Sequence, residues 1–297
     1  MIRGDAIGTP ILAVDIGGTK IESAIVAADG SLLSRVRRLT GGADAEALFA
    51  RLAEAVDATL DAHHRAGGAN PEALGVGCGG PMAPGGETVS PLNIPQWREF
   101  PLRRRLGEHV DLPTWVDNDA KALALGEGWL GAASGEGHYL AMVVSTGVGG
   151  GLVVDGRLVD GASGNAGHIG HIVVEPDGRP CACGGRGCLE AEASGTAIAA
   201  ITGRPAAEAD DAMRRRCGTL VGRAVAALVV ACDLRLACIG GSVALGYGEA
   251  FFTAANAELA HVARIAHARG ARIVPVGLGD EGPLVGAACV ARRALGV

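Results

Sequence analysis

The sequence predicts an α/β protein built from two related lobes with a cleft between them. Both halves of the 297-residue chain repeat one order of elements: an apolar strand, a glycine-rich turn, a second strand, an Asp-Gly turn and a third strand. Strands separated by such turns form β-meanders. Apolar residues at helical spacing further along each half predict helices that cover the sheets. A duplicated unit of this kind indicates two lobes of similar construction.

In the first half, strands are expected at residues 11–15, 21–27, 31–39, 74–78 and 114–117. The glycine turn Gly17–Lys20 separates the first two. Apolar side chains about every four residues predict a helix over 43–66. Asp119 lies where the last of these strands meets an Ala- and Leu-rich helix over 121–130. Open α/β sheets present ligand-binding residues at such junctions.

In the second half, strands are expected at residues 139–145, 152–154, 157–159 and 237–239. A glycine turn over 146–151 matches the first turn in position, and a third glycine turn precedes a helix. Residues 1–118 are predicted to form a small α/β lobe, and residues 119–282 a larger α/β lobe. A C-terminal helix over residues 283–297 is expected to pack back on the small lobe.

Composition excludes several classes of protein. The formal net charge is −6 and no basic run reaches five residues, which argues against nucleic-acid binding. No apolar span of about 18 residues is present, as a membrane helix would require. The N-terminus shows no targeting segment, so we expect a soluble cytoplasmic protein without membrane partners. Five scattered cysteines are expected to be core thiols: Cys78, Cys217, Cys232, Cys238 and Cys289.

A histidine and three closely spaced cysteines form a candidate metal site. His171, Cys181, Cys183 and Cys188 are the ligand types and spacing that tetrahedral zinc prefers. Four protein ligands leave no open position, so the zinc would be structural and would shape the loop over residues 167–190. Disulfides are the alternative, but a reducing cytoplasm disfavours them.

The glycine turns at strand ends are candidate phosphate sites, because backbone N–H groups can approach anionic oxygen where no side chain intervenes. Neither a Walker loop nor a Rossmann fingerprint is present. The alternative is a set of hairpin turns without a ligand. Phosphoryl transfer to an alcohol also needs a base and magnesium. Asp119 is the natural base, Asn118 would orient a polyhydroxylated substrate, and Asp15 is a candidate magnesium ligand.

Six motifs then occur in order: Asp15-Ile-Gly-Gly-Thr-Lys, Asn118-Asp119-Ala120, Ser145-Thr-Gly-Val-Gly-Gly-Gly, Gly161-Ala-Ser-Gly-Asn-Ala-Gly-His-Ile-Gly-His, Cys181-Ala-Cys-Gly-Gly-Arg-Gly-Cys-Leu-Glu and Gly240-Gly-Ser. Together they resemble the ROK family of sugar kinases and repressors from about residue 11 to the C-terminus. The resemblance implies an actin-like ATPase fold (ASKHA, ribonuclease H-like) and phosphorylation of a hexose 6-hydroxyl by ATP with Mg²⁺. It also implies Zn²⁺ at the four residues above, and a homodimer or homotetramer.

Carried over by position, the resemblance makes Asp119 the catalytic base. The implied sugar ligands are Gly80, Asn93, Asn118, Asp119, His168, His171 and Glu190. The implied nucleotide and phosphate ligands are Asp15, Gly17, Gly18, Thr19, Lys20, Thr146, Gly147, Gly149, Gly240, Gly241 and Ser242.

His168 departs from the pattern of many glucokinases in this family, which have glutamate there. The stretch Gly167-His-Ile-Gly-His171 looks like the form found in bacterial N-acetylmannosamine kinases. Imidazole can donate and accept a hydrogen bond, whereas carboxylate only accepts. A 2-acetamido sugar suits it, and so does glucose with a weaker hold. A repressor of the same family is the distant alternative, disfavoured because only 14 residues precede Asp15.

Overall fold

The computed structural model describes residues 8–297, and these divide into two compact units. The first unit comprises residues 8–126, Gly161–Asn165 and Asp280–Val297, and the second comprises Glu127–Asp160 and Ala166–Gly279. The expected absence of a targeting segment and of a preceding DNA-binding domain rests partly on residues 1–7, which lie outside the described residues.

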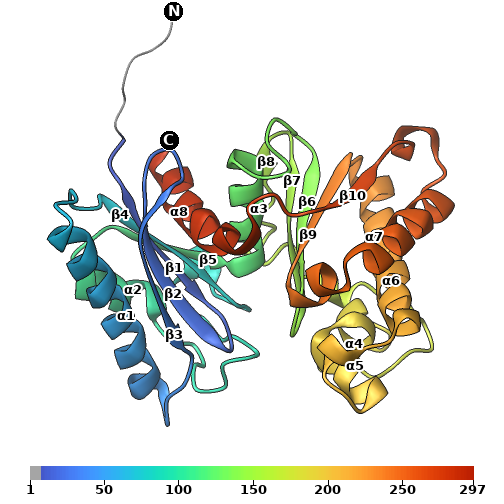
Figure 1. Cartoon of the computed structure of the whole chain (residues 1–297), viewed down its shortest axis with the longest axis horizontal. Helices are drawn as coiled ribbons and strands as arrows, with labels where there is room; N and C mark the ends of the chain where they lie inside the picture. The colour runs from blue at the N-terminus through green and yellow to red at the C-terminus, as the bar shows by residue number, and fades with distance from the viewer. Residues whose placement is uncertain (1–7) are drawn as a thin grey trace, which may run out of the picture. The chain divides into compact units, whose positions relative to one another are not determined.

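Ten strands and eight α-helices make up the described chain (Figure 1). The strands are β1 (Ile11–Ile16), β2 (Lys20–Val26), β3 (Leu32–Leu39), β4 (Ala73–Cys78), β5 (Thr114–Asn118), β6 (Tyr139–Val144), β7 (Val148–Val154), β8 (Arg157–Leu158), β9 (Leu236–Gly240) and β10 (Arg272–Pro275). The helices are α1 (Ala45–Arg65), α2 (Leu102–Val110), α3 (Asp119–Trp129), α4 (Leu189–Ala193), α5 (Gly195–Thr202), α6 (Asp211–Cys232), α7 (Ser242–Val262) and α8 (Gly282–Leu295).

Each unit is built on a five-stranded mixed sheet, and the two sheets share one topology. The first sheet has the order β3-β2-β1-β4-β5 and the second the order β8-β7-β6-β9-β10. In the first sheet, β1 pairs antiparallel with β2 and parallel with β4. In the second sheet, β6 pairs antiparallel with β7 and parallel with β9. The predicted α/β class and the repeated unit are therefore confirmed.

The first sheet is covered by helices on both faces. β1 is buried along its whole length, as expected of a central strand. One face packs against α1 and α2, and the other packs against α8 (Figure 1). Asp44 fixes the start of α1, because its side chain accepts a hydrogen bond from the Ala47 N–H.

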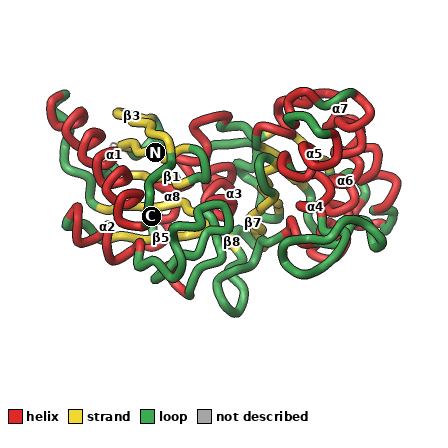
Figure 2. The backbone as a smooth tube through the Cα atoms, turned by 90° about the horizontal axis from the view of Figure 1, so that it is seen from below, coloured by secondary structure: helices red, strands yellow, loops and turns green. Residues whose placement is uncertain are grey.

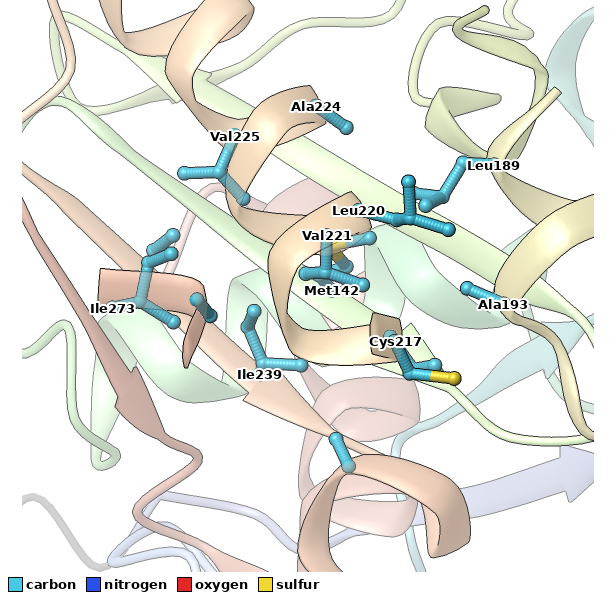
Figure 3. Close-up of a cluster of buried hydrophobic side chains, with 14 of the residues drawn as sticks. Met142, Leu189, Ala193, Cys217, Leu220, Val221, Ala224, Val225, Ile239 and Ile273 are labelled. Atoms are coloured by element: carbon cyan, nitrogen blue, oxygen red, sulfur yellow. The ribbon is translucent and has the colours of Figure 1, made fainter. Parts of the chain in front are cut away.

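The core of the second unit lies between its sheet and a layer of helices. In Figure 2, α4, α5, α6 and α7 gather beside this sheet. Figure 3 shows how Leu220, Val221 and Val225 of α6 meet Met142 and Ile239 of the sheet. Asp210 caps the start of α6 by accepting from the Met213 N–H. Every helix within residues 8–297 is too short or too polar to span a bilayer.

Two local expectations were wrong. The turn expected over 146–151 is shorter, because Gly149, Gly150 and Gly151 lie in β7 and pair with β6. Glycine has a low strand propensity, but here the neighbouring strand and the segment packed on β7 decide the conformation. Cys232 is only half-buried, at the C-terminus of α6, whereas the other four expected core thiols are buried.

Candidate functional site

Two carboxylates lie close together at the strand ends of the first unit. Asp15 stands near the end of β1, paired in register with Gly77 of β4, and Asp119 opens α3 directly after β5. A Cβ added to Gly77 would lie 3.6 Å from the Asp15 Oδ1 and 3.5 Å from the Asp119 Cα. Since Gly77 has no side chain, none at this position separates the two acids.

Asp15 is held in an environment that disfavours its charge. Burial, followed by the neighbouring charge of Asp119, raises the pKa of Asp15 from 3.8 to about 7. Lys20 and Arg35 act in the opposite direction but do not compensate. A carboxyl with such a pKa gains strongly from a cation that would stabilise its ionised form. The surroundings therefore fit a magnesium ligand.

Glu22 is a buried charge that motif reasoning missed. It lies opposite Asp15 across the β1–β2 pair and is fully buried. Burial raises its pKa, but hydrogen bonds from Lys20, Arg37 and Arg35 outweigh it and lower the pKa below the ordinary value. Lys20, a predicted phosphate ligand, thus pairs with Glu22 in this structure. The sequence did contain a signal for this buried acid. Glu22 lies on the same face of an apolar strand as Ala24 and Val26, which are buried.

Asn118 and Asp119 are fixed by the helix that they begin. The Asn118 Oδ1 accepts from the Ala120 N–H at 3.0 Å and from the Lys121 N–H at 3.4 Å, as an N-cap does. Lys121, 2% exposed, forms a 2.7 Å ion pair with Asp117. This pair was also missed by sequence reasoning. It anchors the first turn of α3, which carries the predicted base.

The first glycine turn lies beside two predicted sugar ligands. The Gly17 N–H donates to the Lys20 carbonyl at 2.9 Å, which closes the hairpin. A Cβ on Gly18 would lie 3.0 Å from the Asn93 side chain, and one on Gly79 would lie 3.3 Å from the Asn93 Oδ1. Asn93 therefore lies between this turn and Gly79, which follows β4 and precedes Gly80.

The second and third glycine turns meet in the second unit. Ser145, where β6 ends, has its Oγ 2.9 Å from the Ser242 Oγ at the start of α7. Gly241 has a φ of +94°, and a Cβ there would lie 2.4 Å from the Val144 carbonyl oxygen. Only glycine allows this approach. The predicted residues Thr146, Gly147, Gly240, Gly241 and Ser242 are thus neighbours, whereas Gly149 lies within β7.

The four predicted metal ligands converge. The ligand atoms of His171, Cys181, Cys183 and Cys188 all lie within 4.8 Å of one another. The two cysteine sulfurs Cys183 Sγ and Cys188 Sγ are 3.7 Å apart, and the His171 Nδ1 lies 3.6 Å from the Cys181 Sγ. Thiolates about 2.3 Å from a tetrahedral zinc would be about 3.8 Å apart. The separations fit zinc and are too long for a disulfide.

The loop over 167–190, here called the zinc loop, lies directly on the backbone of β7. The Gly150 N–H donates to the Gly167 carbonyl at 3.0 Å. A Cβ on Gly167, whose φ is +104°, would lie 2.1 Å from the Gly150 carbonyl oxygen. Gly150, which belongs to the glycine run predicted as a phosphate-binding turn, therefore lets the loop dock. His168, the residue after Gly167, is exposed. The centroid of its ring lies 6.1 Å from that of the His171 ring, and the two rings are stacked.

Glu190 connects the zinc loop to the second glycine turn. It follows Cys188 by two residues, and its Oε2 accepts from the Val148 N–H at 3.0 Å. A Cβ on Gly147 would lie 3.0 Å from the same oxygen. The structure therefore groups His168, His171 and Glu190 with the zinc loop of the second unit, and groups Gly80, Asn93, Asn118 and Asp119 with the first unit.

Replacing Asp15 with asparagine should stabilise the protein in a pH-dependent way. The folded carboxyl, with its pKa of about 7, keeps a proton that the unfolded chain has lost above pH 3.8. Wild-type stability therefore falls as pH rises from about 4 to 7. The excess unfolding free energy of Asp15→Asn should grow through this window by up to about 1.4 kcal/mol per pH unit and then level off.

Urea unfolding at pH 4.5, 6, 7 and 8, without magnesium, measures this difference. Asp29→Asn is the control, because a hydrogen bond from Ser31 lowers the pKa of this exposed acid. It should show no such gain. If the unfolding free energy of Asp15→Asn equalled that of wild type at every pH, the raised pKa of Asp15 would be contradicted.

Replacing Cys183 with serine should weaken zinc binding, because the hydroxyl is a poor substitute for thiolate. We expect less than one zinc per chain, measured by elemental analysis. We also expect faster zinc release to a chelator, measured by absorbance. Cys232→Ser is the matched control, since Cys232 is half-buried and outside the cluster. Equal zinc content and release in Cys183→Ser and wild type would refute the site.

Comparison with known proteins connects this arrangement to one family. Residues 11–294 match the sequence profile of the ROK family. A glucokinase of Halalkalibacterium halodurans is 42% identical over 198 residues, which cover 64% of this chain and 58% of the relative. The match thus spans less than two thirds of that relative's length. An N-acetylmannosamine kinase of Escherichia coli O157:H7 is 34% identical over 256 residues, covering 80% of this chain and 84% of the relative.

A solved structure extends the similarity to the fold. The ROK family glucokinase from Streptomyces griseus, crystallised with glucose and AMPPNP, is 30% identical and superposes with a TM-score of 0.80. The alignment covers 96% of this chain and 99% of that one. The actin-like ATPase fold that the resemblance implied is confirmed. The family match over nearly the whole described chain leads to one conclusion: this protein belongs to the ROK family.

Proposed function

We propose that this protein is a kinase that transfers the γ-phosphoryl group of ATP to the 6-hydroxyl of a hexose such as glucose. The observation that carries the proposal is the pair of acids Asp15 and Asp119, which both lie beside Gly77 of β4. Similarity to a glucokinase crystallised with glucose and AMPPNP supports it.

In the proposed reaction, Asp119 is the general base. It takes the proton from the sugar hydroxyl as that oxygen attacks the γ-phosphorus. The bond from this phosphorus to the bridging oxygen breaks, and ADP leaves with the bonding electrons. The capped start of α3 and the buried Lys121–Asp117 pair support this role, because they fix the backbone that carries Asp119.

The nucleotide is assigned to the glycine turns. In the first unit, the candidate ligands are Gly17, Gly18, Thr19 and Lys20. In the second, they are Thr146, Gly147, Gly149, Gly240, Gly241 and Ser242. Their N–H and hydroxyl groups suit phosphate oxygens. Magnesium bound with ATP would neutralise phosphate charge, and Asp15 would hold it directly or through water.

The candidate sugar ligands form two groups. Gly80, Asn93, Asn118 and Asp119 are the candidates in the first unit, and His168, His171 and Glu190 are those in the second. Zinc would act structurally, since four protein ligands leave no open position. Its proposed role is to hold the loop that presents His171 and Glu190.

The second candidate is an N-acetylmannosamine kinase. The observation that favours it is His168, an exposed imidazole at the start of a short 3₁₀ helix (Ile169–His171). An imidazole N–H could donate to the carbonyl of a 2-acetamido group, which a carboxylate could not do. The E. coli relative with that name matches 80% of this chain, whereas the Halalkalibacterium halodurans glucokinase matches 64%.

Asp119→Asn should bind sugar and zinc normally yet lose turnover by about two to four orders of magnitude, because the amide cannot accept the proton. A coupled ADP-release assay and sugar titration by calorimetry separate the two effects. Asp111→Asn is the control, as Asp111 is an exposed acid that ends α2. Near wild-type turnover in Asp119→Asn would remove Asp119 from the role of base.

A substrate panel separates the two candidate functions. ADP release should be measured with glucose, mannose, N-acetylglucosamine, N-acetylmannosamine and fructose. If His168 recognises the acetamido group, wild type should prefer N-acetylmannosamine, and His168→Glu should shift kcat/KM towards glucose by about tenfold or more. Parallel changes for all five sugars would show that His168 does not select the substrate.

A further inference from the structure

Glu192 is a buried acid that accepts three hydrogen bonds, two at its carboxylate and one at its main-chain carbonyl, and it has no part in the site described above. It lies on α4 and is 2% exposed. Its Oε1 accepts from the Arg179 N–H, and its Oε2 accepts from the Arg216 Nη2, both at 2.6 Å. The Arg216 Nη1 also donates to the Glu192 main-chain carbonyl at 2.9 Å. Arg216 of α6 therefore holds both the side chain and the backbone of one residue.

Helix α4 needs such external support. It has five residues, little more than one turn, and so short a helix does not hold its orientation alone. Its apolar side is fixed by Leu189 and Ala193, which face Leu220 and Cys217 of α6 (Figure 3). Apolar contacts of this kind are not directional. The rotation of α4 about its own axis depends on its polar bonds.

The two carboxylates of α4 leave the helix on opposite sides. Successive helical residues are about 100° apart, so Glu190 and Glu192 are separated by about 200°. Glu190 reaches the Val148 N–H at the start of β7, and Glu192 reaches Arg179 and Arg216. A rotation of α4 would break both sets of bonds. The Glu192 bonds therefore oppose a rotation of α4 that would displace Glu190.

The same carboxylate also holds the zinc loop. Arg179 lies two residues before the candidate ligand Cys181, and its N–H is bound by Glu192. A Cβ on Gly178 would lie 2.4 Å from the Glu192 Oε1, so the loop backbone runs directly past this oxygen. Glu192 thus connects the start of the cysteine cluster with the helix that follows it.

We propose that Glu192 and Arg216 are positioning residues that fix the rotation of α4, and so hold Glu190 and the zinc loop in place. The inference rests on the proposed function, in which Glu190 contacts the sugar. A second arginine, Arg223 of α6, also bonds the loop, donating to Glu175 at 2.7 Å and to the Val174 carbonyl at 2.9 Å. Loss of Arg216 alone leaves this anchor intact, so the variants can fold.

The test compares Glu192→Gln, Arg216→Met and Arg216→Lys with wild type. Glutamine can still accept from the Arg179 N–H but loses the ion pair. We expect Glu192→Gln and Arg216→Met to raise KM for the hexose about tenfold, with kcat within about threefold. Zinc release to a chelator should accelerate about 10- to 100-fold, as for lost partners of metal ligands. Arg216→Lys should recover part of both effects.

Arg215→Met is the matched control, because Arg215 is the exposed neighbour of Arg216 on the same helix. It should behave as wild type. If Glu192→Gln and Arg216→Met lowered only the melting temperature, with KM and zinc release unchanged, the pair would be merely structural and the proposal overturned. Absence of hexose phosphorylation by wild type would refute the proposed function instead, and the zinc-release comparison would still decide the positioning of the loop.

Discussion

The close contact between the zinc loop and β7 is the constraint on which the second unit depends. Gly167 and Gly150 meet backbone to backbone, and a Cβ on Gly170 would lie 2.4 Å from the Val148 carbonyl oxygen. A Cβ has no room at Gly167 or Gly170, and the Ile169 side chain of the loop fills the space over Gly150. This contact sets the position of His171. The three cysteines of the cluster lie further along the same loop, and the last of them, Cys188, is the N-cap of α4. The carboxylate of Glu190 consequently returns to the same strand, at Val148.

The sequence was sufficient to predict features that depend on neighbours along the chain. The first three strands, with the glycine turn and the Asp-Gly turn between them, were correctly located, because turn residues and short apolar runs are local signals. The convergence of His171 with the three cysteines could be predicted from ligand type and spacing. The turn after β6 was predicted too long. A run of glycines forms a turn where nothing packs against it, but here β6 and Gly167 pack against the run and hold it in a strand.

Buried charges were the other feature that could not be predicted. Glu192 is buried because Arg216 lies beside it, 24 residues further along the chain. Asp15 and Glu22 make the point more directly. They are opposite one another in one strand pair, yet one pKa is raised and the other lowered. Burial raises the pKa of both acids, but hydrogen bonds from Lys20, Arg37 and Arg35 outweigh burial at Glu22, whereas the charge of Asp119 raises the pKa of Asp15 further. Only the three-dimensional arrangement determines which acid is neutralised.

The division of the chain into units has a consequence for how the protein is synthesised. Most of the first unit is encoded before residue 127, but one of its core clusters needs Leu284, Ala287, Ala288 and Ala291 of α8. The segment Gly161–Asn165 also belongs to it. Because domains generally fold as they emerge from the ribosome, the N-terminal sheet must wait with one face uncovered until α8 has been translated. The unit that is begun first is therefore the last to be completed.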